Sequence, residues 1–323
     1  MIKQLGILNE PLSGSKYHRI LNPLSYLKAN FSTQLTEQLC QGYDIIWINR
    51  YINVWPWQIA LWKEKYGFKI IQDIDDYWVL PFNHYMYSKI DAAKKQLFDQ
   101  LILADIVLCS TPYLLNKCLE FNDNCHLREN YIPIGYQQFQ PEYIPVQNRK
   151  PTIGICGSFS HYDDWMSIRN QLKRIQSLKN EFDFVIAGYA DENSTIREKW
   201  NKIVNLFPNP KVFRHLPVNQ YINFYKHIDI LLAPLEINEF NKAKSNLKIL
   251  ESSIKSTITI SNNLYKEKGI EDYLSTEDKS YFEHISSLRD LEYLNYLKKQ
   301  FQNSLIEKNK GLQTNNQLNK FLI

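Results

Sequence analysis

The segment between Asp229 and Asn262 places lysines and a carboxylate at a spacing that could hold an anionic ligand. An apolar run, 230–233, stops at Pro234, which predicts a buried strand that ends there. The helix expected over 244–254 carries four charged residues on one line, at i, i+4, i+7 and i+11: Lys244, Lys248, Glu251 and Lys255. Beside them, Leu247, Leu250 and Ile254 would form the buried stripe. A helix that starts past the C-terminal end of a strand lies where open α/β sheets bind ligands.

Cationic groups near a helix N-terminus suit a phosphate, because free N–H groups and the helix dipole both favour an anion. Glu251, two turns further along, could accept hydrogen bonds from a ribose diol. The alternative is a solvated charged face on a surface helix.

A second candidate loop follows another expected strand, 152–156. Gly157 would let a ligand approach the backbone closely, and Ser158 with the N–H groups after it could contact a phosphate. His161 belongs to the same loop. Asp163 or Asp164 could serve only to cap the helix that follows.

Three carboxylates come at the end of the expected strand 69–73 and directly after it: Asp73, Asp75 and Asp76. Oxygen ligands of this kind suit a divalent cation. They could equally bind the hydroxyl groups of an acceptor or act as a general base. His84 could lie near a substrate, or it could pack as a structural histidine against Tyr85 and Tyr87.

Two arginines also follow expected strands of the first half. Gly14 lies in the loop after strand 2–8, and Arg19 follows at the start of a helix. Arg19 could contact a phosphate or an acceptor, and a surface arginine is the alternative. Arg50 closes the strand 44–49 at its C-terminal end, which makes it a further candidate of the same kind.

The elements that would position these residues alternate between strands and helices, which predicts an α/β protein with parallel sheets. The expected strands are 2–8, 44–49, 69–73, 105–110, 126–132, 152–156, 182–187, 211–214, 230–233 and 257–261. The expected helices are 17–39, 57–66, 85–103, 112–121, 164–177, 195–206, 219–227, 244–254 and a tail from 286 to 310. A polar stretch, 137–150, reads as a linker. We therefore expect an N-terminal domain, 1–145, a second domain, 150–285, and a helical tail, 286–323.

Length and composition fit two globular domains. The chain has 323 residues, and its net charge of +4 permits contact with anionic lipid or nucleic acid without requiring it. Five scattered cysteines with no C-x-x-C pair argue against a zinc site or a disulfide framework, and they fit a reducing cytoplasm. Neither a signal peptide nor an 18-residue apolar run is present in the sequence. We expect a cytoplasmic protein, with peripheral contact at the inner membrane face left open.

Two stretches resemble motifs of one family. The pairs Pro234-Leu235, Phe240-Asn241, Lys244-Ser245, Leu247-Lys248 and Leu250-Glu251 resemble the donor-binding signature of GT-B glycosyltransferases, in particular the retaining family 4 and its relatives. The run from Gly157 to Asp164 resembles the G-S-x-S-H-x-x-D that opens the second domain of many relatives. The resemblance implies two Rossmann-like domains facing across a cleft, with a C-terminal helix that crosses back to the first domain.

The resemblance also implies roles for individual residues. Glu251 would hold the ribose of the nucleotide, while Lys244 and Ser245 would face the diphosphate and the sugar. Gly14 would approach the donor phosphates, and His84 would lie near the sugar. Further donor contacts would come from the second domain: Gly157, Ser158, His161, Lys248 and Arg214. On the acceptor side the resemblance places Asp73, Asp75, Asp76, His84 and Arg19.

The chain departs from the family pattern at two points. Ala243 stands where many members have a second Glu, and the usual Arg/Lys pair for the diphosphate is missing. Lys244, Lys248 and Arg214 are the expected substitutes. The donor sugar is therefore left open.

Taken together, the sequence predicts a glycosyltransferase that moves a sugar from a nucleotide-diphosphate sugar to a hydroxyl acceptor, with retention and without a metal or a tightly bound cofactor. A glycan or a lipid-linked acceptor is favoured over DNA. Two alternatives stay open: a transferase acting on hydroxymethylated bases of viral DNA, and a non-catalytic protein of the same fold that binds sugar nucleotides or takes part in assembly. The oligomeric state is not predicted.

Overall fold

The computed structural model describes residues 2–8, 12–265, 273–277 and 279–312, with the side chains of 310–312 left aside. Its contacts divide the chain into two compact units. Of the described residues, unit 1 comprises those up to Tyr131 together with Asn238–Ser245, and unit 2 comprises Ile132–Ile237 together with those from Asn246 onward. The short segment 238–245 therefore belongs to unit 1, although residues of unit 2 precede and follow it. Within the described part of the chain, no helix combines the length and the apolar character needed to cross a bilayer.

Unit 1 is built on a six-stranded parallel sheet in the order β2-β1-β3-β4-β5-β6. The strands are β1 (Gln4–Ile7), β2 (Asn30–Ser32), β3 (Ile45–Asn49), β4 (Lys69–Ile74), β5 (Ile106–Cys109) and β6 (Cys125–Leu127). The strand order reverses between β1 and β3, because β2 lies on the far side of β1. In sheets of this kind the reversal marks the place where ligands bind, outside the carboxyl ends of the strands.

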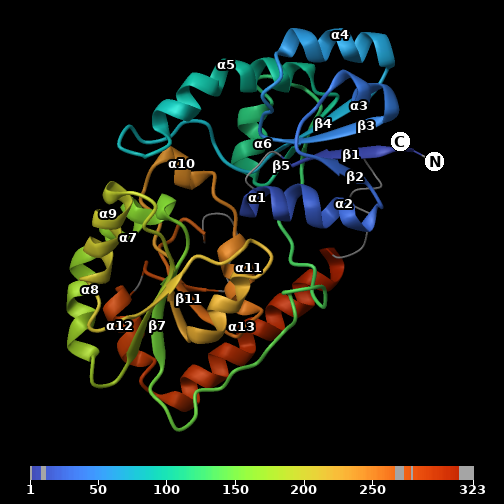
Figure 1. Cartoon of the computed structure of the whole chain (residues 1–323). Coiled ribbons are helices and arrows are strands. Elements are labelled where there is room, and N and C mark those ends of the chain that lie inside the picture. The colour runs from blue at the N-terminus through green and yellow to red at the C-terminus, as the bar shows by residue number, and fades with distance from the viewer. Residues whose placement is uncertain (1, 9–11, 266–272, 278, 313–323) are drawn as a thin grey trace. The chain divides into compact units, whose positions relative to one another are not determined.

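Helices cover both faces of this sheet (Figure 1). They are α1 (Gly14–Lys16), the π-helix η1 (Tyr17–Leu21), α2 (Asn22–Tyr26), α3 (Glu37–Gly42), α4 (Pro56–Tyr66), α5 (Tyr87–Leu103), α6 (Pro112–Cys118) and α10 (Glu239–Lys242). Ile46 and Ile48 face α3 to α6, whereas Ile45 and Trp47 face η1 and α2, as the two-residue period of a strand requires. The single helix predicted over 17–39 was wrong, because β2 interrupts it.

Unit 2 has a second six-stranded parallel sheet, in the order β12-β11-β10-β7-β8-β9. Its strands are β7 (Thr152–Cys156), β8 (Asp183–Tyr189), β9 (Lys211–Arg214), β10 (Ile230–Leu232), β11 (Ile258–Ser261) and β12 (Leu274–Ser275). Counted within the unit this order is 3-2-1-4-5-6, the dinucleotide-binding arrangement with its reversal between β7 and β10. The α/β prediction with two parallel sheets is confirmed.

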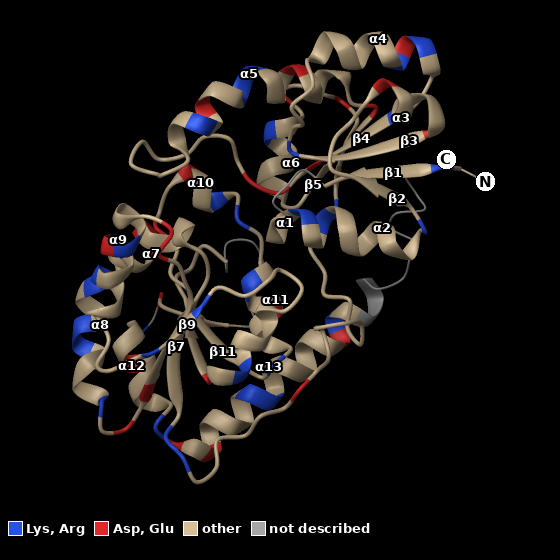
Figure 2. Ribbon diagram, viewed as in Figure 1, with Lys and Arg blue, Asp and Glu red and all other residues tan. Residues whose placement is uncertain are grey.

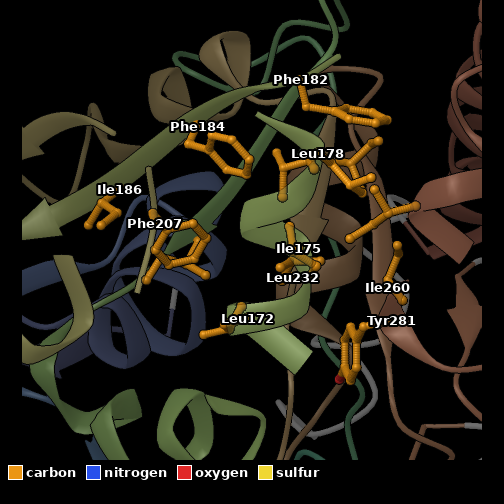
Figure 3. Packing of buried hydrophobic residues seen from close by; sticks show 14 of the residues in the cluster. Leu172, Ile175, Leu178, Phe182, Phe184, Ile186, Phe207, Leu232, Ile260 and Tyr281 are labelled. Atoms are coloured by element: carbon orange, nitrogen blue, oxygen red, sulfur yellow. The ribbon is translucent and has the colours of Figure 1, made fainter. Parts of the chain in front are cut away.

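The helical elements of unit 2 surround this sheet. They are η2 (Phe159–His161), α7 (Tyr162–Ser167), α8 (Arg169–Ile175), η3 (Gln176–Leu178), α9 (Ser194–Val204), η4 (Tyr221–His227), α11 (Leu247–Ser253), α12 (Tyr281–Ser287) and α13 (Leu291–Leu312). η2, η3 and η4 are 3-10 helices. Leu172 and Ile175 of α8 share one helix face and pack into a core with Leu232 and Ile260 of the central strands (Figure 3). Full burial of side chains of this size stabilises the unit by about 1.5–3 kcal/mol each.

A buried ion network fastens α13 to unit 2. Asp229, at the entry to β10, is 3% exposed and contacts the ammonium group of Lys298, which is 1% exposed. The same carboxylate accepts hydrogen bonds from Arg149 Nη2 at 2.9 Å and from the backbone N–H of Thr152 at 2.9 Å. Burial alone would raise the pKa of Asp229, but these donors outweigh it and the pKa lies below its usual range. The predicted return of the tail to the first domain stays a prediction, because residues 313–323 lie outside the described residues.

We expect the variant Asp229→Asn to lose about 3–5 kcal/mol of stability, because it leaves the ammonium of Lys298 buried without a carboxylate. Urea unfolding followed by tryptophan fluorescence measures this loss. The matched control is Glu181→Gln, since Glu181 forms an exposed ion pair with Arg289 in the same unit. That pair should contribute less than about 1 kcal/mol. Equal effects of the two variants would contradict a stabilising role for the Asp229 network.

Candidate functional site

The polar groups of unit 1 gather just beyond the carboxyl ends of β3 and β4. Arg50 follows β3 and adopts a left-handed backbone conformation with φ 58°. Its N–H donates to the Asp73 carbonyl at 2.8 Å and its carbonyl accepts from Gln72 Nε2 at 2.5 Å, and these bonds hold the strained conformation in place. The Arg50 guanidinium therefore turns toward the residues that follow β4.

Arg50, Asp75, Asp76 and Lys244 form what we call the unit 1 ion cluster. Arg50 Nε lies 3.0 Å from Asp75 Oδ1, and Arg50 Nη2 contacts Asp76. Lys244 Nζ lies 2.7 Å from Asp76 Oδ1 and 4.2 Å from the ring centroid of Phe240. Segment 238–245 is in this way tied to the carboxylates that follow β4.

The electrostatics of the cluster keep Asp75 ionised. Burial by itself would raise the pKa of Asp75, but the Arg50 guanidinium and a hydrogen bond from Asn49 Nδ2 at 3.0 Å outweigh it, and the pKa falls well below the usual range. A depressed carboxyl pKa contributes stability above about pH 4, the value in an unfolded chain, and this stability is lost as the pH falls further. At neutral pH Asp75 is therefore a charged group and cannot act as a general acid.

Asp73 has a different role from its two neighbours. It is fully buried, and both of its oxygens lie 2.8 Å from Arg19, which is 2% exposed. Arg128 Nη1 adds a third contact at 3.1 Å. Burial and the nearby Arg19 lower the pKa of Arg128 to about 10, so it keeps its charge at neutral pH. Asp73 and Arg19, both sequence candidates for substrate contact, are thus held inside unit 1, where they join η1 to the sheet.

His84 and Gly14 lie at the edges of this region. The ring of His84 lies 5.5 Å from that of Phe240 and 5.0 Å from that of Tyr85, and its Nδ1 accepts from Met86 N at 3.2 Å. Gly14 opens α1, whose next residue, Ser15, accepts a 2.9 Å hydrogen bond from Arg50. The contact joins the segment after β1 to Arg50 after β3, the two strands between which the sheet order reverses.

The polar groups of unit 2 lie beyond the carboxyl ends of β7 and β10. Gly157 follows β7 with φ 155°, and a Cβ there would lie 2.9 Å from His161 Cδ2 and 3.3 Å from Lys248 Nζ. Only glycine leaves room for both side chains against this backbone. His161 Nδ1 lies 2.9 Å from Asp164 Oδ2, and Asp164 Oδ1 accepts from the backbone N–H of Glu236 at 2.9 Å. Asp164 thus fixes the loop after β10 relative to the loop after β7.

Glu251 of α11 lies 5% exposed within unit 2. It accepts hydrogen bonds from two tyrosine hydroxyls of η4, those of Tyr221 and, at 3.3 Å, Tyr225. We call Glu251, Lys248, Tyr221 and the backbone at Gly157 the unit 2 carboxylate site. A buried carboxylate beside hydroxyl donors is suited to accept hydrogen bonds from a diol.

The helix that carries Glu251 differs from its prediction. It begins at Leu247 and not at Lys244, so Lys244 belongs to unit 1 and does not share a helical line with Lys248. Leu247 and Leu250 are half-buried, whereas Ile249 is buried. Lys255 is buried and donates to the Gln140 carbonyl at 2.7 Å. Ile254 is buried as predicted, but the stripe as a whole does not form, because a seven-residue helix is covered by η4, β11 and α13 rather than by one sheet face.

Of the remaining sequence candidates, Arg214 lies apart from these two groups of residues, whereas Ser158 and Ser245 adjoin Gly157 and Lys244 in the sequence. Arg214, on the edge strand β9, pairs with Asp191 and is 71% exposed. Ser158 Oγ lies 2.6 Å from Ser160 Oγ at the start of η2. Ser245 Oγ accepts from Asn130 Nδ2 at 2.6 Å within unit 1. Among the described residues, no group of three or more His, Cys, Asp or Glu side chains is placed to hold a metal ion.

Known proteins are similar to this chain in fold. No protein-family model matches the sequence, and no curated protein matches it. Solved structures do match the fold. HepE of Anabaena, in complex with UDP and glucose, is similar with a TM-score of 0.64 and 10% identity, over 100% of this chain and 99% of HepE.

Two further structures are similar to the chain. An alpha-glucosyltransferase in complex with UDP and a 13-mer DNA containing an HMU base has a TM-score of 0.62 and 10% identity, over 94% of each chain. A sucrose-phosphate synthase from Thermosynechococcus elongatus has a TM-score of 0.60 and 16% identity, over 87% of this chain and 74% of the synthase. The chain therefore has the GT-B fold, as its sequence predicts. At these identities the likeness concerns the fold alone, because one fold hosts many activities.

Several residues of the site were not singled out from the sequence. Tyr221 and Tyr225 stand in a helical stretch with no recognisable motif, and Asn49 and Arg128 are polar residues beside strands. Only Arg128 could have been inferred from the sequence. A buried Asp73 requires a cationic partner, and few arginines stand near the ends of the expected strands. The tyrosines lie 30 and 26 residues before Glu251, and no local pattern relates them to it.

The buried and half-buried carboxylates of unit 1 should respond differently to substitution. Asp73→Asn leaves Arg19 and Arg128 buried beside a neutral amide, so we expect a loss of about 3–5 kcal/mol. Asp76→Asn removes pairs that are 20% exposed at the carboxylate and should cost less than about 1 kcal/mol. Thermal unfolding compares the two. A fully stable Asp73→Asn protein would refute the structural role.

Proposed function

We propose that the chain is a glycosyltransferase that moves a sugar from a nucleotide-diphosphate sugar to a hydroxyl acceptor. The observation that carries the proposal is the buried carboxylate of Glu251, held by two tyrosine hydroxyls, with Lys248 next to the glycine backbone at Gly157. This combination lies at the strand reversal of a dinucleotide-binding sheet. HepE and the alpha-glucosyltransferase, which share the fold, are in complex with UDP, which supports a uridine diphosphate donor.

In the proposed donor complex, unit 2 binds the nucleotide. Glu251 accepts hydrogen bonds from the ribose diol, and these bonds replace those that the diol makes to water in solution. Lys248, with the N–H groups that follow Gly157, stabilises the diphosphate. Negative charge builds up on the diphosphate as the glycosidic bond breaks, so these groups lower the barrier of the chemical step.

We propose that unit 1 supplies the acceptor side. We assign Asp76 and His84 to the hydroxyl of the acceptor, since Asp73 is enclosed by arginines. Lys244 then orients Asp76 through their ion pair, a role different from the donor contact that its sequence position suggests. Because each carboxylate after β4 already pairs with a cation, we also propose a transfer that needs no divalent metal. The resemblance of the segment from Pro234 to Glu251 to the retaining family supports a transfer that retains the anomeric configuration.

The cysteines favour a reducing compartment for this reaction. All five are unpaired thiols, and hydrogen bonding to Cys118 together with burial raises the pKa of the Cys109 thiol. A hydrogen bond with Cys109, together with burial, likewise raises the pKa of the Cys125 thiol. Adjacent thiols that stay reduced suit the cytoplasm, which we propose as the site of action.

The donor assignment predicts a specific loss of affinity. Glu251→Gln should weaken UDP binding about 10- to 100-fold, because a hydrogen bond to a charged group contributes about 1.5–3 kcal/mol. It should also reduce the preference for UDP over 2′-deoxy-UDP, which a general loss of folding would not do. Isothermal titration calorimetry measures both, with Tyr221→Phe as a milder variant and the exposed Glu198→Gln as the control. An unchanged preference in Glu251→Gln would refute contact with the ribose.

The acceptor assignment predicts that substitutions in unit 1 lower the reaction rate but leave the affinity for UDP unchanged. Asp76→Asn and Lys244→Met should slow the hydrolysis of UDP-glucose, with water as acceptor, by about 100-fold, the size of a general-base effect. The Kd for UDP should remain that of the unmodified protein, because both residues lie in unit 1. Steady-state hydrolysis and calorimetry provide the two readouts. Binding of UDP without turnover in the unmodified protein would favour the non-catalytic alternative.

A further inference from the structure

A pocket of ≈ 720 Å³ opens at the amino-terminal edge of the unit 2 sheet. The first residues of three strands line it: Thr152 of β7, Asp183 of β8 and Lys211 of β9. Gly157 lies five residues along β7 from Thr152, which is about 17 Å at ~3.3 Å per residue. The pocket is thus separate from the unit 2 carboxylate site, and the proposed transfer does not use it.

Positive charge predominates in the lining of this pocket. It contains four cationic side chains, Arg149, Lys179, Lys211 and Lys226, against one carboxylate, Asp183. Four positive charges less one negative charge leave +3 with His227 neutral. Figure 2 shows blue residues in the loops at the lower end of β7, where the pocket lies. An excess of this size in one concave surface attracts an anionic ligand.

Ion pairs around the pocket do not cancel this excess. Arg149 pairs with Asp229 and Lys226 with Glu142, but each of these carboxylates also contacts a further lysine, Lys298 or Lys255. Each added negative charge is therefore matched by an added positive one, and the balance stays at +3.

Two of the four cations have no carboxylate partner. Neither Lys179 nor Lys211 pairs with an acidic side chain of the described residues. Lys211 Nζ instead lies 4.8 Å from the ring centroid of Phe213, on which His227 is stacked at 4.6 Å. Burial, together with Lys211 and Lys226, lowers the pKa of His227. Its neutral imidazole can then donate a hydrogen bond to an anion that Lys179 and Lys211 attract.

A second pocket, of ≈ 480 Å³, shares Lys226 with the first. Its lining is rich in amide side chains: Gln137, Gln138, Gln140, Asn219, Gln220 and Asn223. Gln138 and Gln140 are held in place by hydrogen bonds to the carbonyls of Val218, at 2.9 Å, and Gly135, at 2.7 Å. An amide both donates and accepts, so a row of amides is suited to sugar hydroxyls.

We propose that these two pockets together bind a phosphorylated sugar. The phosphate group occupies the cationic pocket, where Lys179, Lys211 and Lys226 donate charge-assisted hydrogen bonds to its oxygens. The sugar hydroxyls lie against the amides of the second pocket, on the other side of Lys226. The ligand binds independently of the nucleotide at Glu251.

Calorimetry on the full chain tests the proposal, with glucose 6-phosphate and inorganic phosphate as probes. We expect glucose 6-phosphate to bind at least about fivefold more tightly than phosphate, the effect of roughly one additional hydrogen bond. The double variant Lys179→Gln/Lys211→Gln should weaken it by at least about tenfold, since two charge-assisted bonds are lost. The matched control is Lys173→Gln/Lys202→Gln, which removes the same charge from exposed helix positions of unit 2.

All four lysines are exposed, so we expect the variants to fold as the unmodified protein does, and unchanged UDP binding in the double variant verifies this. Three results would overturn the proposal: no binding of glucose 6-phosphate at 0.15 M salt, equal affinity for phosphate and glucose 6-phosphate, or equal weakening in the control variant. Loss of UDP binding in Glu251→Gln with glucose 6-phosphate binding retained would support two separate sites.

Discussion

The parallel order of the strands is the constraint on which both groups of candidate functional residues depend. Parallel strands bring their carboxyl ends to one edge, and a reversal of strand order leaves that edge open at one place. In unit 1 the reversal lies between β1 and β3, where Ser15 meets Arg50. In unit 2 it lies between β7 and β10, where Asp164 joins the loop at Gly157 to Glu236. The candidate functional groups gather at these two edges because the carboxyl ends of parallel strands meet there.

The degree of burial then determines the role of each charged residue. Asp73, Asp75 and Asp76 are neighbours in the sequence, yet they meet different surroundings. Asp73 lies inside β4 and faces two buried arginines, so its charge is needed for the packing of η1. Asp76 lies beyond the strand end, keeps part of its surface exposed and meets Lys244 across 168 residues of sequence. A buried carboxylate with two guanidinium partners stabilises structure, whereas a half-buried one with flexible partners can serve chemistry.

The fold could be predicted from the sequence more completely than the contacts between side chains could. Runs of apolar residues bounded by Gly, Pro and Asp located most strands, because buried parallel strands leave that pattern. Glu251 and Gly157 could be singled out because they stand in recognisable motifs, and their roles stay predictions. Lys244 was assigned to the wrong element, because periodicity extended the helix across Asn246, where the structure begins a separate helix at Leu247. Its partner Asp76 could not be inferred, since a contact over such a separation depends on how the whole unit packs.

The same limit applies to the tyrosines and to the pocket at the amino-terminal edge. Tyr221 meets Glu251 only because η4 and α11 pack side by side in unit 2. Lys179, Lys211 and Lys226 are ordinary surface lysines in the sequence, and the lysine-rich composition hides them. Three separate strand and helix ends bring them to one concave surface. Tertiary placement, and not residue type, makes these groups specific.

The most direct test of the account is a thermal-shift comparison of UDP, GDP, ADP, CMP and dTDP, each with and without magnesium. A ligand that binds only the native state raises the Tm by mass action, by an amount that grows with its affinity. The account predicts a shift with one nucleoside diphosphate, UDP, that is the same in the presence and absence of magnesium. A shift that requires magnesium would contradict the metal-independent site, and the absence of a shift with every nucleotide would contradict the proposed donor-binding role of Glu251.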